Sequence, residues 1–194
     1  MRGIRNAHLK GVGITLITVF NMGFKLSKKT MHLIKCGKTV YVDMDNVLVN
    51  FQSGLDRVPE MIKREYADDG TGKPHYDDIP HIFSLMDPMP GAIEAMRKLW
   101  PYYQLYILST APWQNPSAWS DKVEWVQRYF GKGKDSIFYK RLIISHHKDL
   151  NRGDFLIDDR EKNGASEFQG ELIQFGTEKY PDWNAIVEYL LKQV

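Results

Sequence analysis

The segment of residues 39–51 constrains the fold of this chain more than any other, because it joins a buried strand to two closely spaced carboxylates. Residues 40–42 are β-branched or aromatic, and they predict a strand. Asp43 and Asp45 follow this strand directly, and Asn46 is a residue that tolerates turn or left-handed backbone. The Asp-x-Asp pattern alone also fits an acidic turn after an edge strand. The other motifs of the chain have to decide between a functional site and such a turn.

Strand-like and helix-like segments alternate along the rest of the chain. We expect strands at residues 105–108, 141–145, 154–157 and 171–175, and helices at residues 91–100, 117–130 and 183–191. In the second of these helices, the apolar pattern suggests as core residues Trp119, Val123, Val126, Tyr129 and Phe130. The alternation predicts an α/β fold, a Rossmann-like parallel sheet with flanking helices.

The chain divides into a predicted core, a cap and an N-terminal extension. The core domain consists of residues 31–51 and 91–194, and residues 52–90 form a small helical cap inserted after the first strand. We expect the cap to begin as a helix that Pro59 interrupts, and then to become irregular. Residues 1–30 are an extension of a different character.

The extension contains a mostly apolar run, residues 11–20, which is too short to span a membrane. It follows basic residues as in a signal peptide, but no small-x-small cleavage site comes after it. It lacks acids like an organelle transit peptide, but it is poor in serine. We favour a third interpretation, an over-long gene model in which Met31 or Met22 is the true start.

The charge of the chain is unevenly distributed. Residues 1–42 hold eight basic residues and no acid, which leaves 18 of the 26 basic residues and all 24 acidic ones in residues 43–194. The net negative charge of residues 43–194 disfavours binding to a nucleic-acid polymer, and it suits a small substrate bound through a metal ion. The single cysteine, Cys36, excludes an internal disulfide and fits a reducing compartment, so we expect a cytoplasmic protein without a membrane association.

Four of the predicted strands are followed by polar residues. These are Asp43 and Asp45, then Ser109 and Thr110, then Lys148, and finally Asp158 and Asp159. The carboxyl ends of parallel strands meet at one edge of a sheet, which is where α/β proteins bind their ligands. Because close carboxylates repel each other, a cation is the natural third member of such a group.

This order of motifs resembles the haloacid dehalogenase superfamily of phosphohydrolases over residues 39–160. The shared features are a strand ending in Asp-x-Asp, a strand ending in Ser, a Lys, and a strand ending in Asp-Asp. Within the superfamily, the sequences of these motifs are similar to those of the 5′(3′)-deoxyribonucleotidases, including the Ser-Thr-Ala-Pro-Trp turn that begins at Ser109. The chain departs from the pattern at Asn46, where Gly is commoner.

The resemblance implies a role for each of these positions. Asp43 would be the nucleophile, and Asp45 the acid that protonates the leaving group and later the base that activates water. Ser109 and Lys148 would bind the phosphoryl oxygens and offset their charge. Mg²⁺ would be held by Asp43, the backbone carbonyl of Asp45, and Asp158, with Asp159 as an additional acid.

The substrate would also contact residues outside this group. Phe51 and Trp113 are the candidates for stacking on a nucleobase, and Thr110 would join Ser109 and Lys148 in binding the substrate. The structural alternative is that both aromatic side chains belong to the core.

The resemblance therefore implies a Mg²⁺-dependent phosphatase that hydrolyses nucleoside monophosphates, most naturally deoxyribonucleotides, through an aspartyl-phosphate. One alternative is a phosphatase or phosphotransferase of the same fold that acts on another small phosphomonoester. A second alternative is a non-catalytic binding module that retains the fold. The sequence leaves open the preferred base, the preference between 5′ and 3′ phosphates, and the oligomeric state, a homodimer included.

Overall fold

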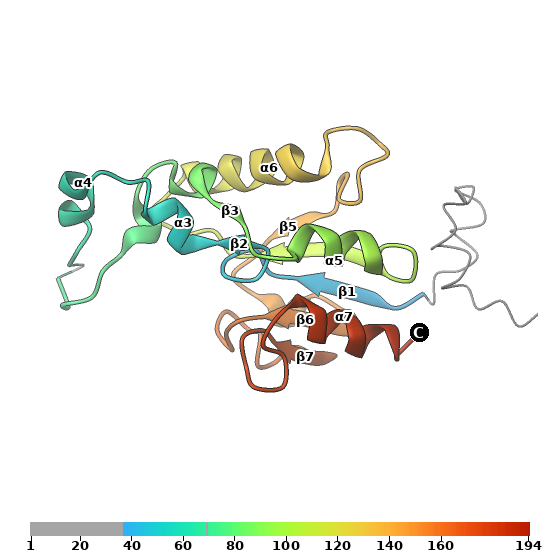
Figure 1. Ribbon diagram of the computed structural model, residues 1–194. Helices are drawn as coiled ribbons and strands as arrows, with labels where there is room; N and C mark the ends of the chain where they lie inside the picture. Colours follow the sequence, from blue (N-terminus) through green and yellow to red (C-terminus); the bar gives the residue numbers. More distant parts are fainter. Residues whose placement is uncertain (1–36, 69) are drawn as a thin grey trace, which may run out of the picture. The chain divides into compact units, whose positions relative to one another are not determined.

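The computed structural model describes residues 37–68 and 70–194, and its centre is a five-stranded parallel sheet (Figure 1). The strand order is β5-β4-β1-β6-β7, and every neighbouring pair is parallel. The five strands are β1 (Thr39–Val42), β4 (Gln104–Ser109), β5 (Leu142–Ile144), β6 (Phe155–Asp158) and β7 (Glu171–Gln174). All five lie where the sequence predicts them, to within a few residues, and the predicted α/β fold is confirmed.

Strand β1 lies in the middle of the sheet, and this determines where the polar residues at the strand ends lie. Val42 is level with Ile107 of β4 on one side and with Ile157 of β6 on the other. Beyond this level, the backbone N–H of Asp43 donates to the carbonyl of Ile157 at 2.9 Å. The first carboxylate therefore emerges beside the one that ends β6, because the two strands pair in parallel up to that point.

The two faces of the sheet are covered differently. Three helices cover one face, and their buried residues share one apolar cluster with the side chains of alternate strand positions such as Val40 and Val42. These helices are α5 (Ala92–Leu99), α6 (Ser117–Phe130) and α7 (Trp183–Leu191). Tyr41 points to the opposite face, where Ala165 and Phe168 of the β6–β7 connection close a smaller cluster. The period of two in the strands explains this division.

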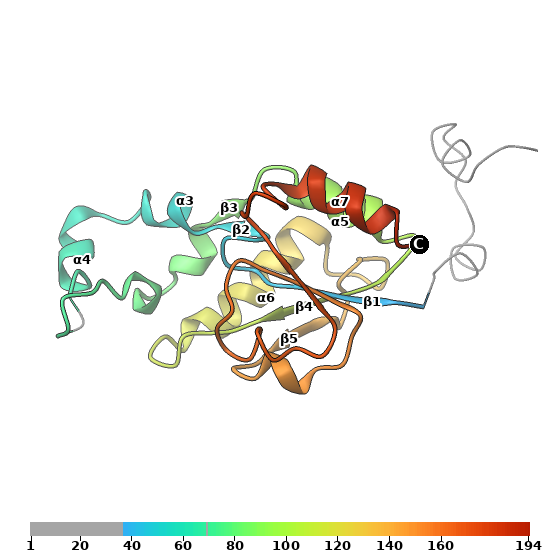
Figure 2. The same cartoon turned by 90° about the horizontal axis from the view of Figure 1, so that it is seen from below.

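The segment predicted to form a cap, residues 52–90 and called the cap below, is more structured than the sequence predicts. It contains α3 (Phe51–Leu55), α4 (Glu60–Glu65) and the 3₁₀ turns η1 (Tyr76–Asp78) and η2 (Ile82–Leu85). The predicted interruption at Pro59 is present, since Pro59 is the N-cap residue of α4. A two-stranded antiparallel ribbon that the sequence analysis missed, β2 (Val49–Asn50) with β3 (Asp87–Pro88), closes the base of the cap. In both views the cap lies beyond the carboxyl end of β1, away from the C terminus of the chain (Figure 2).

Buried hydrogen bonds fix the cap to α6 and to the loop before it. The indole N–H of Trp125 donates to the carbonyl of Met86 at 2.9 Å. The side-chain amide of Asn115 donates to the carbonyls of Asp77 and Ile79 at 2.8 and 2.9 Å. Gly54 lets α3 approach η2, because a Cβ at this position would lie 2.8 Å from the side chain of Met86. The cap is therefore held to the core at several separate points.

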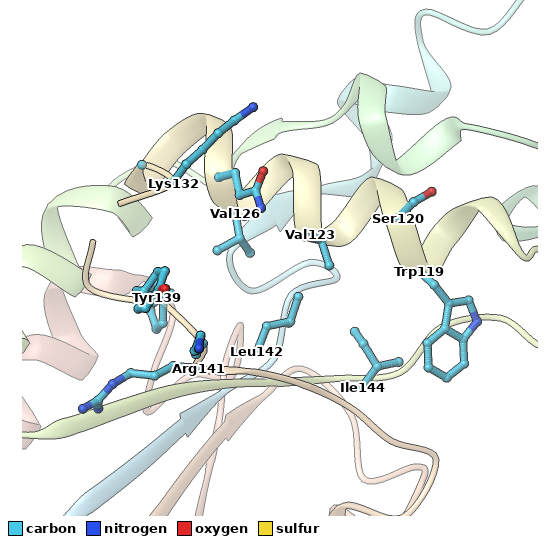
Figure 3. Close-up of a pocket in the computed structure, with 13 residues that line it drawn as sticks. Trp119, Ser120, Val123, Val126, Lys132, Tyr139, Arg141, Leu142 and Ile144 are labelled. Carbon is cyan, nitrogen blue, oxygen red and sulfur yellow. The ribbon is translucent and has the colours of Figure 1, made fainter. Parts of the chain in front are cut away.

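Helix α6 buries only part of the set predicted for the core, in which Tyr129 and Phe130 are half-buried against the core cluster. Trp119 and Val123, expected in the core, are each 41% exposed, although Val126 is buried as predicted. The exposed pair lines a cavity of ≈ 610 Å³ between α6 and the edge strand β5, opposite Leu142 and Ile144 (Figure 3). The buried residues of α6 are Ala118, Asp121, Lys122, Trp125 and Val126.

The predictions for residues 1–30 and for Met31 as a start lie outside the described residues. Among the helices that the structure describes, none is long and apolar enough to cross a membrane.

Candidate active site

Three carboxylates gather at the carboxyl edge of the sheet. Asp43 follows β1, Asp158 ends β6, and Asp159 is the next residue. One oxygen from each lies within 4.8 Å of the others, and Asp43 and Asp158 are only 3% and 2% exposed. The parallel pairing of β1 with β6 brings together residues that are 115 positions apart in the sequence.

Lys148 provides the charge that balances this cluster. It opens the 3₁₀ turn η3 (Lys148–Leu150) in the connection from β5 to β6, and its backbone N–H donates to the carbonyl of Asn163. The buried ammonium donates to Oδ1 of Asp43 at 2.9 Å and to the carboxylate of Asp158. Burial by itself lowers the pKa of Lys148, but the two carboxylates outweigh it, and the pKa is raised. Lys148 is therefore charged at neutral pH.

One cation does not fully compensate two buried carboxylates. Burial, followed by the charge of Asp43, raises the pKa of Asp158 from 3.8 to about 6. Oδ1 of Asp159 is buried and accepts no hydrogen bond from the described residues, and the nearest cation is Nε of Arg160 at 3.4 Å. A group of hard oxygen donors with excess negative charge fits a divalent cation such as Mg²⁺.

Asp45 lies apart from this cluster and has a partner that the sequence analysis missed. Its Oδ1 accepts a hydrogen bond at 2.7 Å from Nζ of Lys122, a fully buried residue of α6. The same ammonium donates to Oγ of Ser109 at 3.1 Å, so it joins the ends of β1 and β4. Burial, as the largest effect, raises the pKa of Asp45, and Lys122 opposes part of that rise.

A pocket of ≈ 320 Å³ opens beside Asp45. Phe51 and Tyr76 line it from the cap side, and Asn46 and Arg160 line it from the core. Asn46 has a positive φ of 58°, as its residue type predicts, and this backbone turns the chain sharply after Asp45. The phenyl ring of Phe51 meets the ring of Phe83 edge to face at 6.1 Å.

Arg160 is a second residue that the sequence analysis passed over. It directly follows the Asp158-Asp159 pair, and that position next to a predicted metal site was the signal that could have identified it. Burial by itself lowers the pKa of Arg160, but the nearby carboxylates, Asp159 first, outweigh it, so the guanidinium remains charged.

Two predicted substrate contacts lie away from this pocket. Trp113 is 78% exposed and contacts the ring of His146 edge to face at 6.1 Å, and it does not line the pocket beside Asp45. The hydroxyl of Thr110 donates to the carbonyl of Ser145 at 3.1 Å. Their contacts with a substrate remain predictions.

Comparisons with known proteins decide the family. A family model described as 5′ nucleotidase, deoxy (Pyrimidine), cytosolic type C protein matches residues 74–184. A protein of Vibrio phage KVP40, provisionally named 5′(3′)-deoxyribonucleotidase, is 54% identical over 154 residues, which cover 79% of this chain and 85% of that protein. The chain belongs to the 5′(3′)-deoxyribonucleotidase family.

More distant members extend the match. The human 5′(3′)-deoxyribonucleotidase of the cytosolic type is 26% identical over 171 residues, which cover 76% of this chain and 78% of the human one. Among solved structures, a HAD-hydrolase of Bacillus subtilis bound to magnesium has a TM-score of 0.45 at 12% identity, over 76% of this chain and 90% of that one. The predicted resemblance to the 5′(3′)-deoxyribonucleotidases is confirmed, and so is the predicted enzyme class, a phosphoric monoester hydrolase of the nucleotidase type.

Proposed function

We propose that this chain hydrolyses deoxyribonucleoside monophosphates in a Mg²⁺-dependent reaction that passes through an aspartyl-phosphate on Asp43. The observation that carries the proposal is the arrangement around Asp43. Its buried carboxylate is held by Lys148, it lies beside the carboxylates of Asp158 and Asp159, and Asp45, two residues along the chain, lines a pocket together with Phe51. This arrangement supports the roles proposed for Asp43 as nucleophile, Lys148 as phosphate-binding group and Asp45 as proton donor.

The chemistry takes two displacements at phosphorus. In the first, an oxygen of Asp43 forms a bond to phosphorus, and the bond from phosphorus to the leaving oxygen breaks. The leaving oxygen keeps the electron pair and takes a proton from Asp45. In the second, the oxygen of a water attacks the same phosphorus and gives a proton to Asp45, and the bond to Asp43 breaks. The products are the nucleoside and inorganic phosphate, and both aspartates return to their initial states.

The residues that would hold Mg²⁺ are Asp43, Asp158 and the backbone carbonyl of Asp45, with Asp159 as a further acid. The excess negative charge of the cluster supports this assignment, as does Oδ1 of Asp159, which is buried and accepts no hydrogen bond from the described residues. When bound, the ion supplies positive charge against the phosphate oxygens. Lys148 remains necessary beside it, because it holds the carboxylate of Asp43 in one orientation.

The pocket beside Asp45 supports a nucleotide over a smaller phosphomonoester. Its volume of ≈ 320 Å³ is at the lower end of the usual range for small-molecule sites. Phe51 offers an aromatic face for a base, and Arg160 offers a cation in the same pocket that suits a phosphate. The names of the phage and human relatives point to the same substrate class.

A screen of phosphomonoesters with and without Mg²⁺ tests the proposal. Deoxyribonucleotides are expected to give the highest kcat/KM, about 10- to 100-fold above their ribonucleotide counterparts, because a 2′-hydroxyl buried without a partner costs about 1 to 3 kcal/mol. Preference for a sugar phosphate would move the chain to the broader phosphatase alternative. Nucleotide binding without turnover would favour the non-catalytic module. The cytoplasmic location and a homodimeric state remain predictions.

A further inference from the structure

Lys122 is a charged side chain with no exposed surface, in the middle of a 14-residue helix. A buried ammonium is costly unless each of its protons finds a partner. Nζ donates to Oδ1 of Asp45 at 2.7 Å and to Oγ of Ser109 at 3.1 Å. It also lies 4.4 Å from the centre of the Phe83 ring, which is a cation–π contact.

These three contacts use up the donors of the ammonium. A lysine has three N–H groups, and here two donate to side-chain oxygens while the third direction faces the Phe83 ring. No donor is left for a phosphate oxygen. Lys148, in contrast, contacts the nucleophile itself. The two buried lysines therefore have different tasks.

The side chain of Lys122 is enclosed by residues of the cap and of α6. Phe83 belongs to η2 of the cap, and Trp125, one turn along α6 from Lys122, donates to the carbonyl of Met86 just after η2. The ammonium is thus held between the cap and the sheet. Because it binds Oδ1 of Asp45, Oδ2 stays available for a leaving group.

We propose that Lys122 is a positioning residue that orients Asp45 for proton transfer to the leaving oxygen. This inference rests on the proposed function, in which Asp45 is the proton donor. Lys122 acts through Asp45 and does not touch the substrate, so its effect depends on how much the leaving group needs a proton. A leaving group that departs easily as an anion needs little help, and a basic one needs much.

The test compares two phosphates of similar shape that lack a nucleobase. p-Nitrophenyl phosphate releases a weakly basic phenolate, and phenyl phosphate releases a more basic one. The measured quantity is kcat/KM, which includes steps only up to the first irreversible one and so excludes hydrolysis of the aspartyl-phosphate. Lys122→Met keeps the length of the side chain and removes the charge. Lys132→Met, an exposed position just beyond α6, is the matched control.

Lys122→Met is expected to lower kcat/KM by about 100-fold for phenyl phosphate and by less than about 10-fold for p-nitrophenyl phosphate, in line with the usual size of general-acid effects. Lys132→Met should change neither value. A double-mutant cycle adds an independent readout. In an Asp45→Asn background, Lys122→Met should cost almost nothing further, because the group through which it acts is already gone.

Several outcomes would overturn this inference. Equal losses on the two phosphates, or a full additional loss in the Asp45→Asn background, would make Lys122 a phosphate-binding or merely structural residue. If Lys122→Met does not fold, Lys122→Gln replaces it, and its loss must again be greater on phenyl phosphate. A wild-type protein that turns over neither of these phosphates nor a deoxyribonucleotide would refute the proposed function as well, whereas an active wild type with an indifferent Lys122→Met would refute the inference alone.

Discussion

Replacing Lys148 with Met should destabilise the protein strongly, and more at high pH than at low pH. Nζ of Lys148 bonds to the carboxylates of Asp43 and Asp158, and all three groups are almost fully buried. Lys148→Met keeps an unbranched apolar side chain in the space and removes only the ammonium. It leaves two buried carboxylates facing each other without a cation. Breaking a buried ion pair in this way costs about 3 to 5 kcal/mol.

The pH dependence follows from the carboxyl of Asp158. Its pKa in the folded protein is about 6, above the ordinary value of 3.8. Between these two values the folded protein keeps a proton that the unfolded chain has released, so stability falls as pH rises through this window. Lys148 lowers the pKa of Asp158, and its removal lets the carboxyl keep its proton to higher pH. The difference in stability between wild type and variant should therefore grow from about pH 5 to about pH 8.

The assay is urea unfolding with a chelator present, near pH 5 and near pH 8, on wild type, Lys148→Met and the exposed Lys132→Met. The control should stay within about 0.5 kcal/mol of wild type, as is usual for surface substitutions. A destabilisation by Lys148→Met of under about 1 kcal/mol near pH 8 would refute the reasoning, since it would mean that the two carboxylates do not need this cation. A larger effect at low pH than at high pH would refute the assignment of the charge to Asp158.

Three further predictions concern catalysis. Asp43→Asn should leave the fold intact and reduce kcat by more than about 100-fold, because an amide is not a nucleophile; a folded variant that keeps more activity would remove Asp43 from this role. A chelator should stop turnover, Mg²⁺ should restore it and Ca²⁺ should restore it poorly because of its looser coordination, so full activity in excess chelator would contradict the proposed mechanism. Phe51→Ala should lower kcat/KM for deoxyribonucleotides by about 10- to 100-fold, a loss of about 1 to 3 kcal/mol of base stacking, and should leave p-nitrophenyl phosphate nearly unchanged. Equal losses on the two substrates would show that Phe51 supports the fold instead.

The sheet and the positions of its polar strand ends could be predicted from the sequence because both depend on local patterns. Short β-branched runs such as residues 40–42 predict strands, and alternation with helices predicts parallel pairing. Parallel pairing then places the carboxyl ends of β1 and β6 together, which is why Asp43 and Asp158 could be grouped from the sequence, whereas Lys148 reaches them from the connection between β5 and β6. No contact between distant residues had to be guessed.

The fold of the cap could not be predicted from such local patterns. Strands β2 and β3 have two residues each and pair across nearly 40 positions, so neither has a periodic signal of its own. The pocket wall depends on the same non-local arrangement. Phe51 is next to the predicted motif and could be proposed, but Tyr76 reaches the pocket only because the irregular part of the cap returns to the carboxyl edge of the sheet beside Asp45.

Two charged residues of helix α6 mark its buried face, although the more apolar pattern lies on another face. Two stripes along this helix have helical spacing, and the one that begins at Trp119 is the more apolar. The stripe that is buried begins one residue earlier, at Ala118, and it carries Asp121 and Lys122. Adjacent charges on an otherwise apolar face cannot be buried without partners, so they indicate partners that the helix itself does not provide. For Lys122 those partners are Asp45 and Ser109, at the ends of two strands. Which of the two stripes is buried depends on whether Lys122 finds a carboxylate as its partner. Only the folded sheet brings the carboxylate of Asp45 to this lysine.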